Sequence, residues 1–382
     1  SATYAAAVTE DGQLFSWGSF GEQQAPTLGH RHGEVLLGTT ADGCNYSPVP
    51  TAVRALRSMH VTHVSCGPEH AAAVTANGVA YCWGSGDRGR LGIGSEVDAW
   101  APQQVADLNG KRVVAVACGT VHTLALTVRG ELFVWGGARS GKLGLGGVGF
   151  CDTFVHKTRS GQPFVPRPKA VSALAAMHVT HIGASRAHSL AITEEGSLYT
   201  WGCGKDGKLG HGGSEPEWLP RRVSSTLTVH IVQAACGREH TSAVTDDGLL
   251  FSWGRGVHGK LGVGSEDDVD RPARVTRLPG PVNQVCCGKH HTLCAVGHRP
   301  VSDDRVALYE RQLEKVLLQT AATETSERAR RAAGEASPAQ RARSGSGASR
   351  RSEREQRGHD AVQPRSGAVE HQARVEAPAA EH

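Results

Sequence analysis

Apolar and polar residues alternate in short segments along the first three quarters of the chain, and a tight turn follows many of them. In the segment HTLALT, residues 122–127, alternation places His122, Leu124 and Leu126 on one face. The Arg129-Gly130 turn leads into ELFVWG, where Phe133 and Trp135 share a face. This period-two pattern with glycine turns predicts antiparallel β-strands joined as hairpins.

The same unit recurs along the chain. Trp-Gly occurs with gaps of 66, 52, 66 and 52 residues, at Trp17, Trp83, Trp135, Trp201 and Trp253. A histidine keeps step with gaps of 52, 66, 52 and 51 residues, at His70, His122, His188, His240 and His291. The unit is therefore about 52 residues long, and two copies carry 14 extra residues in the loops 18–50 and 136–168.

Each unit holds four strand-like segments, and no helical pattern interrupts them. Four short strands repeated around an axis are typical of a β-propeller. We therefore predict an all-β propeller over residues 1–297, with five Trp-Gly units and a partial sixth. Its sheets are expected to be four-stranded, and the five tryptophans are expected in equivalent buried positions.

These motifs resemble a known repeat. The pattern VACGxxHTxALTxxGxLxxWGxGxxGKLGxG…PxxV is similar to that of the regulator-of-chromosome-condensation family, and it covers most of residues 4–296. It departs at Ala184-Ser185, which replace Cys-Gly, and at Tyr4, which replaces the histidine. Members of that family usually have seven repeats. The resemblance therefore implies a ring that is incomplete in this chain, which we interpret as a fragment of a longer protein.

Two kinds of motif are typical of binding or catalytic sites, but their context in this chain favours a structural role. Gly-x-Gly-x-x-Gly follows a strand three times, starting at Gly84, Gly202 and Gly254, yet no helix follows to bind a dinucleotide phosphate. The repeated histidines occupy one strand register, which predicts a ring of buried side chains hydrogen-bonded to backbone. Within each MHVTH copy, two histidines three positions apart lie on opposite faces of a strand, a poor metal site. We therefore predict no catalytic, cofactor or metal site.

Composition narrows the classes of partner. The net charge of +4 is spread thinly over 382 residues, so neither nucleic acid nor a small-molecule substrate is expected as the main ligand. No apolar run is long enough to span a membrane, and no signal peptide opens the chain. Four of the 10 cysteines recur at one position of the repeat, which predicts buried thiols in a reducing compartment, cytoplasmic or nuclear.

The C-terminal part has a different composition. Residues 302–320 have helical spacing and predict a short amphipathic helix. Residues 321–382 are poor in large apolar side chains and are expected to be disordered, with an Arg-rich stretch that could contact RNA weakly. We expect sharp, poorly dispersed amide signals from 321–382 in an NMR spectrum, and early cleavage there by protease. Protected amides in this segment would contradict the prediction.

Three groups of residues are candidates for partner binding. Trp100 and Trp218 align with Asp270 in the repeat, and each tryptophan is either a binding hot spot or a loop anchor packed on a neighbouring blade. The insertion 136–168 is either a binding loop or an idle excursion. Its preferred contact residues are Phe154, Lys157 and Arg159. An acidic loop supplies the third group, Glu266, Asp267, Asp268 and Asp270.

The function predicted from these features is a non-enzymatic protein-interaction scaffold. The alternative is a guanine-nucleotide exchange factor for a small GTPase, because the resemblance implies family members that act on GTPases through a segment protruding from one blade. Plant ultraviolet photoreceptors of the same family cluster many extra tryptophans. Since only Trp100 and Trp218 lie outside the repeat position, that function is not expected here.

Overall fold

The computed structural model describes residues 4–18, 47–147, 155–226 and 229–297. The chain divides into two units, 1–317 and 318–382. The predicted helix at 302–320 and the predicted disordered tail lie outside the described residues.

Six antiparallel sheets account for the described strands, with short 3₁₀ turns between them. The first three sheets follow the order of hydrogen-bonded neighbours: β1 (Tyr4–Val8), β2 (Leu14–Gly18) and β3 (Ser47–Ala52); β4 (Val61–Cys66), β5 (His70–Thr75), β6 (Ala80–Gly84) and β7 (Ala99–Gln104); β8 (Val113–Cys118), β9 (His122–Thr127), β10 (Leu132–Gly137), β12 (Pro163–Ala170) and β11 (His156–Lys157).

The other three sheets repeat this pattern: β13 (Val179–Ala184), β14 (His188–Thr193), β15 (Leu198–Gly202) and β16 (Glu217–Arg222); β17 (Ile231–Cys236), β18 (His240–Thr245), β19 (Leu250–Gly254) and β20 (Val269–Arg274); β21 (Val282–Cys287) and β22 (Thr292–Val296). The 3₁₀ turns are η1 (Arg54–Leu56), η2 (Asp87–Gly89), η3 (Ala106–Leu108), η4 (Arg139–Gly141), η5 (Ser172–Leu174), η6 (Lys205–Gly207), η7 (Ser224–Thr226) and η8 (Val257–Gly259).

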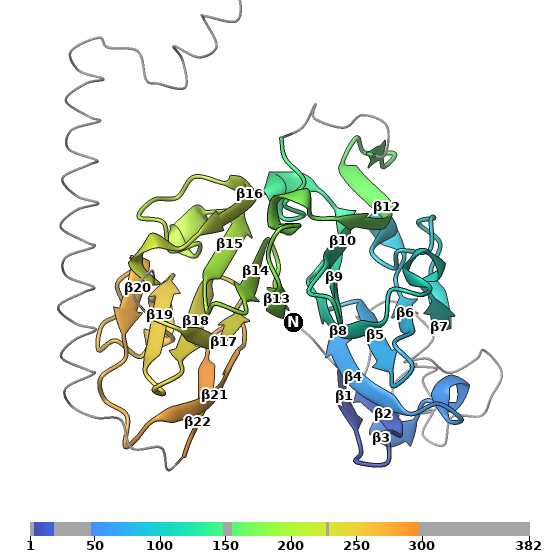
Figure 1. The fold of residues 1–382 in the computed structure, drawn as a ribbon, viewed down its shortest axis with the longest axis horizontal. Helices are drawn as coiled ribbons and strands as arrows, with labels where there is room; N and C mark the ends of the chain where they lie inside the picture. The colour runs from blue at the N-terminus through green and yellow to red at the C-terminus, as the bar shows by residue number, and fades with distance from the viewer. Residues whose placement is uncertain (1–3, 19–46, 148–154, 227–228, 298–382) are drawn as a thin grey trace, which may run out of the picture. The chain divides into compact units, whose positions relative to one another are not determined.

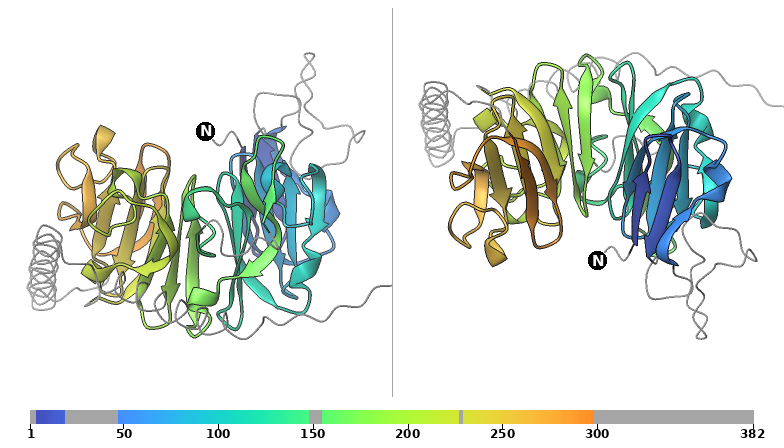
Figure 2. Two further views of the ribbon diagram at one scale, coloured as in Figure 1. Left: turned by 90° about the horizontal axis from the view of Figure 1, so that it is seen from above. Right: turned by 90° about the horizontal axis from the view of Figure 1, so that it is seen from below.

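The sheets follow one another around an arc in chain order (Figure 1). The strands β4, β8, β13 and β17 lie innermost and pack on one another. On the outer side lie β7, β16 and β20, and in the third sheet β12 with the short strand β11 beyond it. Views from above and below show the sheets standing side by side as blades (Figure 2). The predicted propeller is confirmed. The expectation of uniform four-stranded sheets was wrong, because the described sheets range from two strands to five.

The repeated glycine turns have the backbone conformation that the sequence predicts. Gly130 has a φ of 74° in the turn between β9 and β10. A Cβ at this position would also collide with the His178 ring at 2.7 Å, so only glycine fits without a shift. The equivalent turn glycines have positive φ as well, at Gly12, Gly78, Gly196 and Gly248.

Three of the repeated tryptophans form a hydrogen bond to the sheet that precedes their own. The indole N–H groups of Trp135, Trp201 and Trp253 donate to the carbonyls of Arg90, Lys142 and Lys208, at 2.9, 3.0 and 3.1 Å. These tryptophans and Trp83 are buried. Trp17 is only half-buried, so its predicted equivalence was wrong. No sheet among the described residues packs on the first sheet from that side and offers such a carbonyl.

The histidines at the start of the second strand bridge each sheet to the next. His70 Nε2 lies 2.8 Å from Thr123 Oγ1, and the Thr123 hydroxyl donates to the Arg90 carbonyl. Because the single proton of that hydroxyl is donated to the carbonyl, the hydroxyl can only accept from His70, which therefore donates from Nε2. His122, His188 and His240 repeat the arrangement with Ser189, Thr241 and Thr292.

Two predictions about these histidines need correction. Their partners are hydroxyl groups of the following sheet rather than backbone, because the ring reaches across the interface between sheets. The ring of identical buried side chains stops at His291, which is exposed. No sheet in the described part of the chain follows β22, so nothing there covers this side chain.

Tyr4 takes the histidine position in the first sheet, and its surroundings explain the replacement. It pairs with Gly18 as His70 pairs with Gly84. Ala71 stands in the second sheet where the third to sixth sheets have a serine or threonine, so no hydroxyl faces Tyr4. The Tyr4 hydroxyl instead donates to the backbone carbonyl of His70. The longer phenol compensates for the missing hydroxyl of its neighbour.

Candidate functional site

One edge of the arc carries the variable loops, and we call it the loop rim. It comprises the turns between the first and second strands and the loops between the third and fourth strands of each sheet. The two kinds of segment are joined by backbone hydrogen bonds, as between Ser85 N and the Glu69 carbonyl and between Gly137 N and the Val121 carbonyl, both 2.7 Å. The described loop rim comprises 67–69, 85–98, 119–121, 138–147, 155–162, 185–187, 203–216, 237–239, 255–268 and 288–290.

Both insertions join the same pair of strands in the repeat, and the described part of the second one lies on the loop rim. Residues 19–46 connect β2 to β3, and the other insertion connects β10 to β12, so each joins the third strand to the fourth. The end of the second insertion forms a hairpin of β11 and β12, in which His156 pairs with Phe164. Lys157 and Arg159 are exposed on this hairpin. Phe154 lies outside the described residues. The structure thus brings the two predicted basic side chains together on one projecting element.

The two spare tryptophans lie at the outer strands. Trp100 in β7 and Trp218 in β16 are half-buried. The Trp218 carbonyl accepts a hydrogen bond from Gly146 N of the preceding loop at 3.0 Å. A Cβ on Gly141 would lie 2.8 Å from the Trp218 Cα, so the two backbones are in close contact. The same backbone bond occurs at Pro166 and Asp270, which accept from Gly94 N and Gly212 N. The contact therefore does not depend on a tryptophan, and the role of either indole, as an anchor or in binding, stays a prediction.

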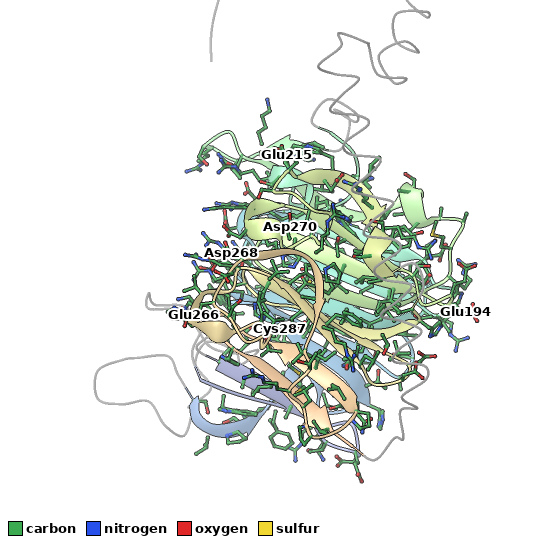
Figure 3. The ribbon with its side chains drawn as sticks, turned by 90° about the vertical axis from the view of Figure 1, so that its left-hand side faces the viewer. Glu194, Glu215, Glu266, Asp268, Asp270 and Cys287 are labelled. Atoms are coloured by element: carbon green, nitrogen blue, oxygen red, sulfur yellow. The ribbon has the colours of Figure 1, made fainter. Side chains whose placement is uncertain are left out.

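Acidic side chains gather on the loop rim of the fifth sheet. Glu266 and Asp268 lie toward one edge, and Glu194 lies toward the opposite edge (Figure 3). Asp270 follows in β20. Glu266, Asp267 and Asp270 are exposed. Asp268 has a structural partner, since its Oδ1 accepts a hydrogen bond from Gly256 N at 2.9 Å. This bond leaves Asp268 less free for a partner than the sequence suggested.

The Gly-x-Gly-x-x-Gly motifs are structural turns. Each leads into a three-residue 3₁₀ turn, η2, η6 or η8. The Gly86 and Gly256 N–H groups donate to Asp98 and Asp268, at 2.8 and 2.9 Å. A Cβ at Gly86 would lie 2.1 Å from the Val97 carbonyl oxygen, so the turn needs glycine. Carboxylates of the chain itself thus occupy N–H groups that a dinucleotide phosphate would require.

The described histidines and cysteines do not assemble into a metal centre. No group of three or more His, Cys, Asp or Glu side chains with suitable placement occurs among the described residues. His181 bonds the Ala234 carbonyl at 2.8 Å, and His63 accepts from Val116 N at 3.4 Å, so each links its inner strand to the next sheet. Nor does any described helix have the length and apolar character that crossing a membrane requires.

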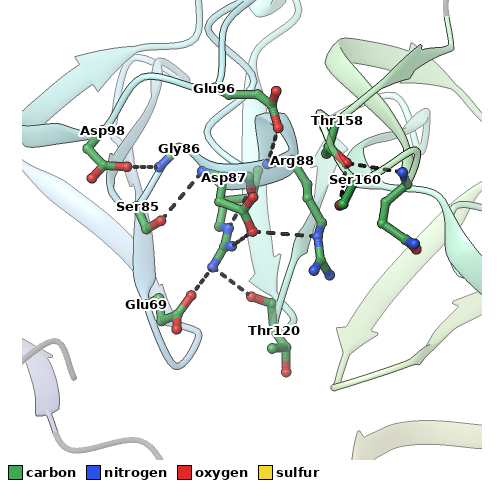
Figure 4. Close-up of polar contacts among 12 residues, drawn as sticks. Glu69, Ser85, Gly86, Asp87, Arg88, Glu96, Asp98, Thr120, Thr158 and Ser160 are labelled. Carbon is green, nitrogen blue, oxygen red and sulfur yellow. Dashed lines mark hydrogen bonds and ion pairs between the residues drawn. The ribbon is translucent and has the colours of Figure 1, made fainter. Parts of the chain in front are cut away.

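A second repeated feature of the loop rim is a buried cation. Arg90 is 1% exposed, and it forms ion pairs with Glu69 at 2.5 Å and Asp87 at 2.6 Å (Figure 4). Its guanidinium also donates to the Thr120 carbonyl of the next sheet at 3.2 Å. Equivalent positions hold Lys142, Lys208 and Lys260, each about as buried, at 5%, 4% and 5% exposure. Their backbone carbonyls accept the hydroxyl and indole bonds described above.

The repeat pattern already contains these cations, because its GKLG segment has a lysine at this position. Aligning the repeats sets Arg90, Lys142, Lys208 and Lys260 in one column. The residue before the repeated histidine forms a second column of Glu69, Val121, Ala187 and Glu239. A comparison of the two aligned positions therefore shows an acid beside the cation in the second and fifth sheets, Glu69 and Glu239, and none in the third and fourth sheets.

Comparison with known proteins agrees with the fold. The model of the RCC1-like domain matches residues 1–301. The chain is 34% identical over 301 residues to the human E3 ubiquitin-protein ligase HERC2, covering 78% of this chain and 6% of that protein. It is 34% identical over 272 residues to the Arabidopsis thaliana ultraviolet-B receptor UVR8, covering 71% of this chain and 56% of the receptor. The chain thus spans only part of these relatives.

Solved structures show the same architecture. Human WBSCR16 superposes with a TM-score of 0.63 at 25% identity, over 78% of this chain and 70% of that chain. Prp20p from Saccharomyces cerevisiae, whose structure was described with its binding properties to Gsp1p and histones, superposes with a TM-score of 0.63 at 23% identity, over 82% and 70%. The match of the domain model over most of the chain, together with the strand order and the repeated Trp, His and cation positions, shows that this protein belongs to the RCC1-like domain family.

Proposed function

We propose that the described domain is a protein-interaction module that binds a partner through its loop rim. The observation that carries this proposal is the contrast between a fixed scaffold and exposed, variable loops. The histidines and tryptophans of the repeat are committed to contacts between sheets. The charged side chains that differ between sheets, such as Lys157, Arg159 and Glu266, are exposed on one edge. Binding residues are usually found on loops held by a rigid scaffold.

The hairpin of β11 and β12 is the preferred contact. It adds a fifth strand to the third sheet alone and exposes Lys157 and Arg159. Its Thr158-Gln162 turn is closed by a backbone hydrogen bond of 2.9 Å, so both cations are carried on an ordered element. A preorganised contact loses less conformational entropy on binding than a flexible loop. We expect an acidic surface on the partner at this point.

A charge-reversal experiment tests the module. Partners captured by the intact chain are identified first, and affinity is then measured for a Lys157→Glu, Arg159→Glu double variant. We expect affinity to fall roughly tenfold, which corresponds to about 1.4 kcal/mol. In the matched control, the charges of Arg57 and Arg129 are reversed by substitution with glutamate. Both are exposed cations on the opposite edge. Equal losses in both double variants, or no loss in the first, would count against the loop rim as the binding surface.

Nucleotide exchange on a small GTPase is the second candidate function, and the single projecting hairpin favours it. An exchange factor binds the nucleotide-free GTPase much more tightly than the loaded form, because its effect rests on differential binding of that intermediate. Small GTPases loaded with a fluorescent nucleotide are mixed with the chain. Accelerated release that slows in the Lys157→Glu, Arg159→Glu variant would favour exchange. We expect instead capture of a protein partner that does not depend on nucleotide.

A further inference from the structure

The buried cation of the third sheet lacks the counter-ions that its equivalents have. In the second sheet, Arg90 is neutralised by Glu69 and Asp87. In the fifth sheet, Lys260 Nζ lies 3.5 Å from Glu239. In the third sheet, Val121 takes the position of Glu69, and Arg139 takes that of Asp87. Both acids are thus replaced, one by an apolar side chain and the other by a cation.

Lys142 is consequently a buried cation without a partner. Its side chain is 5% exposed, and its Nζ makes no hydrogen bond or ion pair with any described residue. Lys208 differs, because its Nζ donates to the Lys205 carbonyl at 2.7 Å. Burying an unpaired charge is costly, so such groups are normally paired in native proteins. Lys142 is not fully enclosed, because its Nζ is not one of the buried side-chain atoms without a partner among the described residues. The ammonium group therefore reaches solvent at the loop rim, where a ligand could contact it.

Three arginines surround this lysine from three successive sheets. Arg139 lies in η4 of the same loop. Arg88 reaches over from the preceding sheet, where its Cδ lies 3.4 Å from the point that a Cβ on Gly137 would occupy. Arg186 belongs to the following sheet and stands at the position of Thr120, whose carbonyl contacts the equivalent cation Arg90. The three arginines thus come from the second, third and fourth sheets, and the charge of each acts on Lys142.

Most of this positive charge is not neutralised by the chain. Arg139 and Arg186 are exposed and form no ion pair with described residues. Arg88 lies 3.5 Å from Asp87, which it shares with Arg90. Burial, followed by the charges of Arg88, Arg139 and Arg186, lowers the pKa of Lys142 to about 8, against a raising effect from Cys203. At neutral pH the lysine remains mostly protonated.

We propose that Lys142, Arg88, Arg139 and Arg186 form a binding site for a phosphate group carried by a side chain of a partner protein. The assignment rests on the proposed function, because it names a chemical feature of the partner bound at the loop rim. A phosphate dianion matches a cluster of several cations better than a single carboxylate does. Guanidinium groups also bind phosphate oxygens with paired hydrogen bonds.

The surroundings favour an isolated phosphate over a nucleic acid. A nucleic acid backbone needs a stripe of positive charge along its regularly spaced phosphates. The neighbouring loops carry acids instead, Glu96 and Asp98 in the second sheet and Glu215 in the fourth, and Glu217 follows at the start of β16. These carboxylates would repel a polyanion that extended beyond the central cluster.

Inorganic phosphate and O-phosphoserine are the probes that test the site, and the Cε–Hε signals of Lys142 report binding. We expect both probes to shift these signals at neutral pH and to raise the pKa of Lys142. Binding is expected to weaken as the pH rises past about 8, where the free lysine loses its proton. Acetate at equal concentration should have little effect. Absence of any phosphate-dependent shift, or an equal response to acetate, would overturn the proposal.

Val121→Glu is the decisive variant, because it restores the acid that the second and fifth sheets carry. We expect the folded variant to bind phosphate at least tenfold more weakly. Lys142→Met, which keeps the length of the side chain, provides a second test if the glutamate disturbs folding. Glu239→Val is the control, since it alters another buried cation pair and should leave binding at Lys142 unchanged.

The remaining outcomes separate this proposal from the proposed function. Unchanged phosphate affinity in the Val121→Glu variant would contradict the site. Tighter binding of a single-stranded oligonucleotide than of O-phosphoserine, lost on Lys142→Met, would replace the assigned ligand with nucleic acid. Because the phosphate titration needs no partner protein, its failure is distinguishable from failure of partner capture through Lys157 and Arg159.

Discussion

Acidification from pH 6.5 to 5.5 is expected to lower the free energy of unfolding by roughly 4 kcal/mol. Desolvation by burial lowers the pKa of four repeat histidines, to about 3 for His188 and about 4 for His240, and well below the usual value for His70 and His122. In the unfolded chain the same groups take up protons near pH 6.5. The unfolded state therefore binds more protons than the folded state as the pH falls through 6.5, and each histidine lowers the stability by about 1 kcal/mol between pH 6.5 and 5.5.

The geometry explains why these rings stay neutral. Each Nε2 already donates to a hydroxyl of the next sheet, and each Nδ1 is buried without a partner among the described residues. A second proton would place an unpaired charge at Nδ1 inside the interface between sheets. Neighbouring cations, such as Arg90 beside His70 and Lys208 beside His188, lower the pKa further.

Urea unfolding at a series of pH values measures the effect. A His188→Gln variant should be less stable at pH 7 and should show a shallower pH dependence between 6.5 and 5.5, by about 1 kcal/mol, because one titrating group is gone. Exposed His291 provides the control, since His291→Gln should leave the dependence unchanged. A stability that does not vary over this range would contradict burial of the four histidines as neutral rings.

Truncation of Trp135 to alanine is expected to cost about 3–5 kcal/mol of stability, as for other large buried aromatics. The side chain is fully buried in the interface between the second and third sheets, and its N–H is bonded to the Arg90 carbonyl at 2.9 Å. The midpoint of urea unfolding, followed by circular dichroism, gives the loss. Trp135→Phe should lose less, because it keeps most of the apolar contact and forfeits the hydrogen bond.

Trp17→Ala serves as the matched comparison within the same repeat position. Trp17 is half-buried and lacks a described sheet on its outer side, so its truncation should cost clearly less than that of Trp135. Equal losses at both positions would indicate that packing between sheets contributes little to the stability of this tryptophan position.

The sequence predicted the strands, the glycine turns and the propeller because those features depend on residues close together in the chain. Gly130 and the Phe133/Trp135 pair are examples, since a tight turn and a period of two act within one hairpin. The strand β11 was not predicted, because it is only two residues long inside an insertion without repeat partners.

Contacts between sheets were harder to predict. The partner of His70 is a hydroxyl 53 residues away, and one of the two counter-ions of Arg90, Glu69, is 21 residues away in a different loop. Such pairs become visible only when it is known which face of one sheet meets the next. The candidate site shows the same difference. The spacing of the repeats was enough to predict that both insertions lie on one rim. The missing counter-ion of Lys142 could be recognised only from contacts between sheets.

The pairing of Tyr4 with the carbonyl of His70 has a consequence for the ancestry of the array. At each interface between neighbouring described sheets, the two residues that meet are complementary. A histidine of one sheet faces a hydroxyl residue of the next, whereas Tyr4 faces a sheet that has Ala71 at the hydroxyl position. A histidine ahead of Ala71 would leave a buried donor unsatisfied, at a cost of about 1–3 kcal/mol. A tyrosine ahead of Thr123 would crowd an occupied interface. Units that arose as copies of one another are therefore no longer interchangeable, and recombination that shuffles them would be selected against junction by junction.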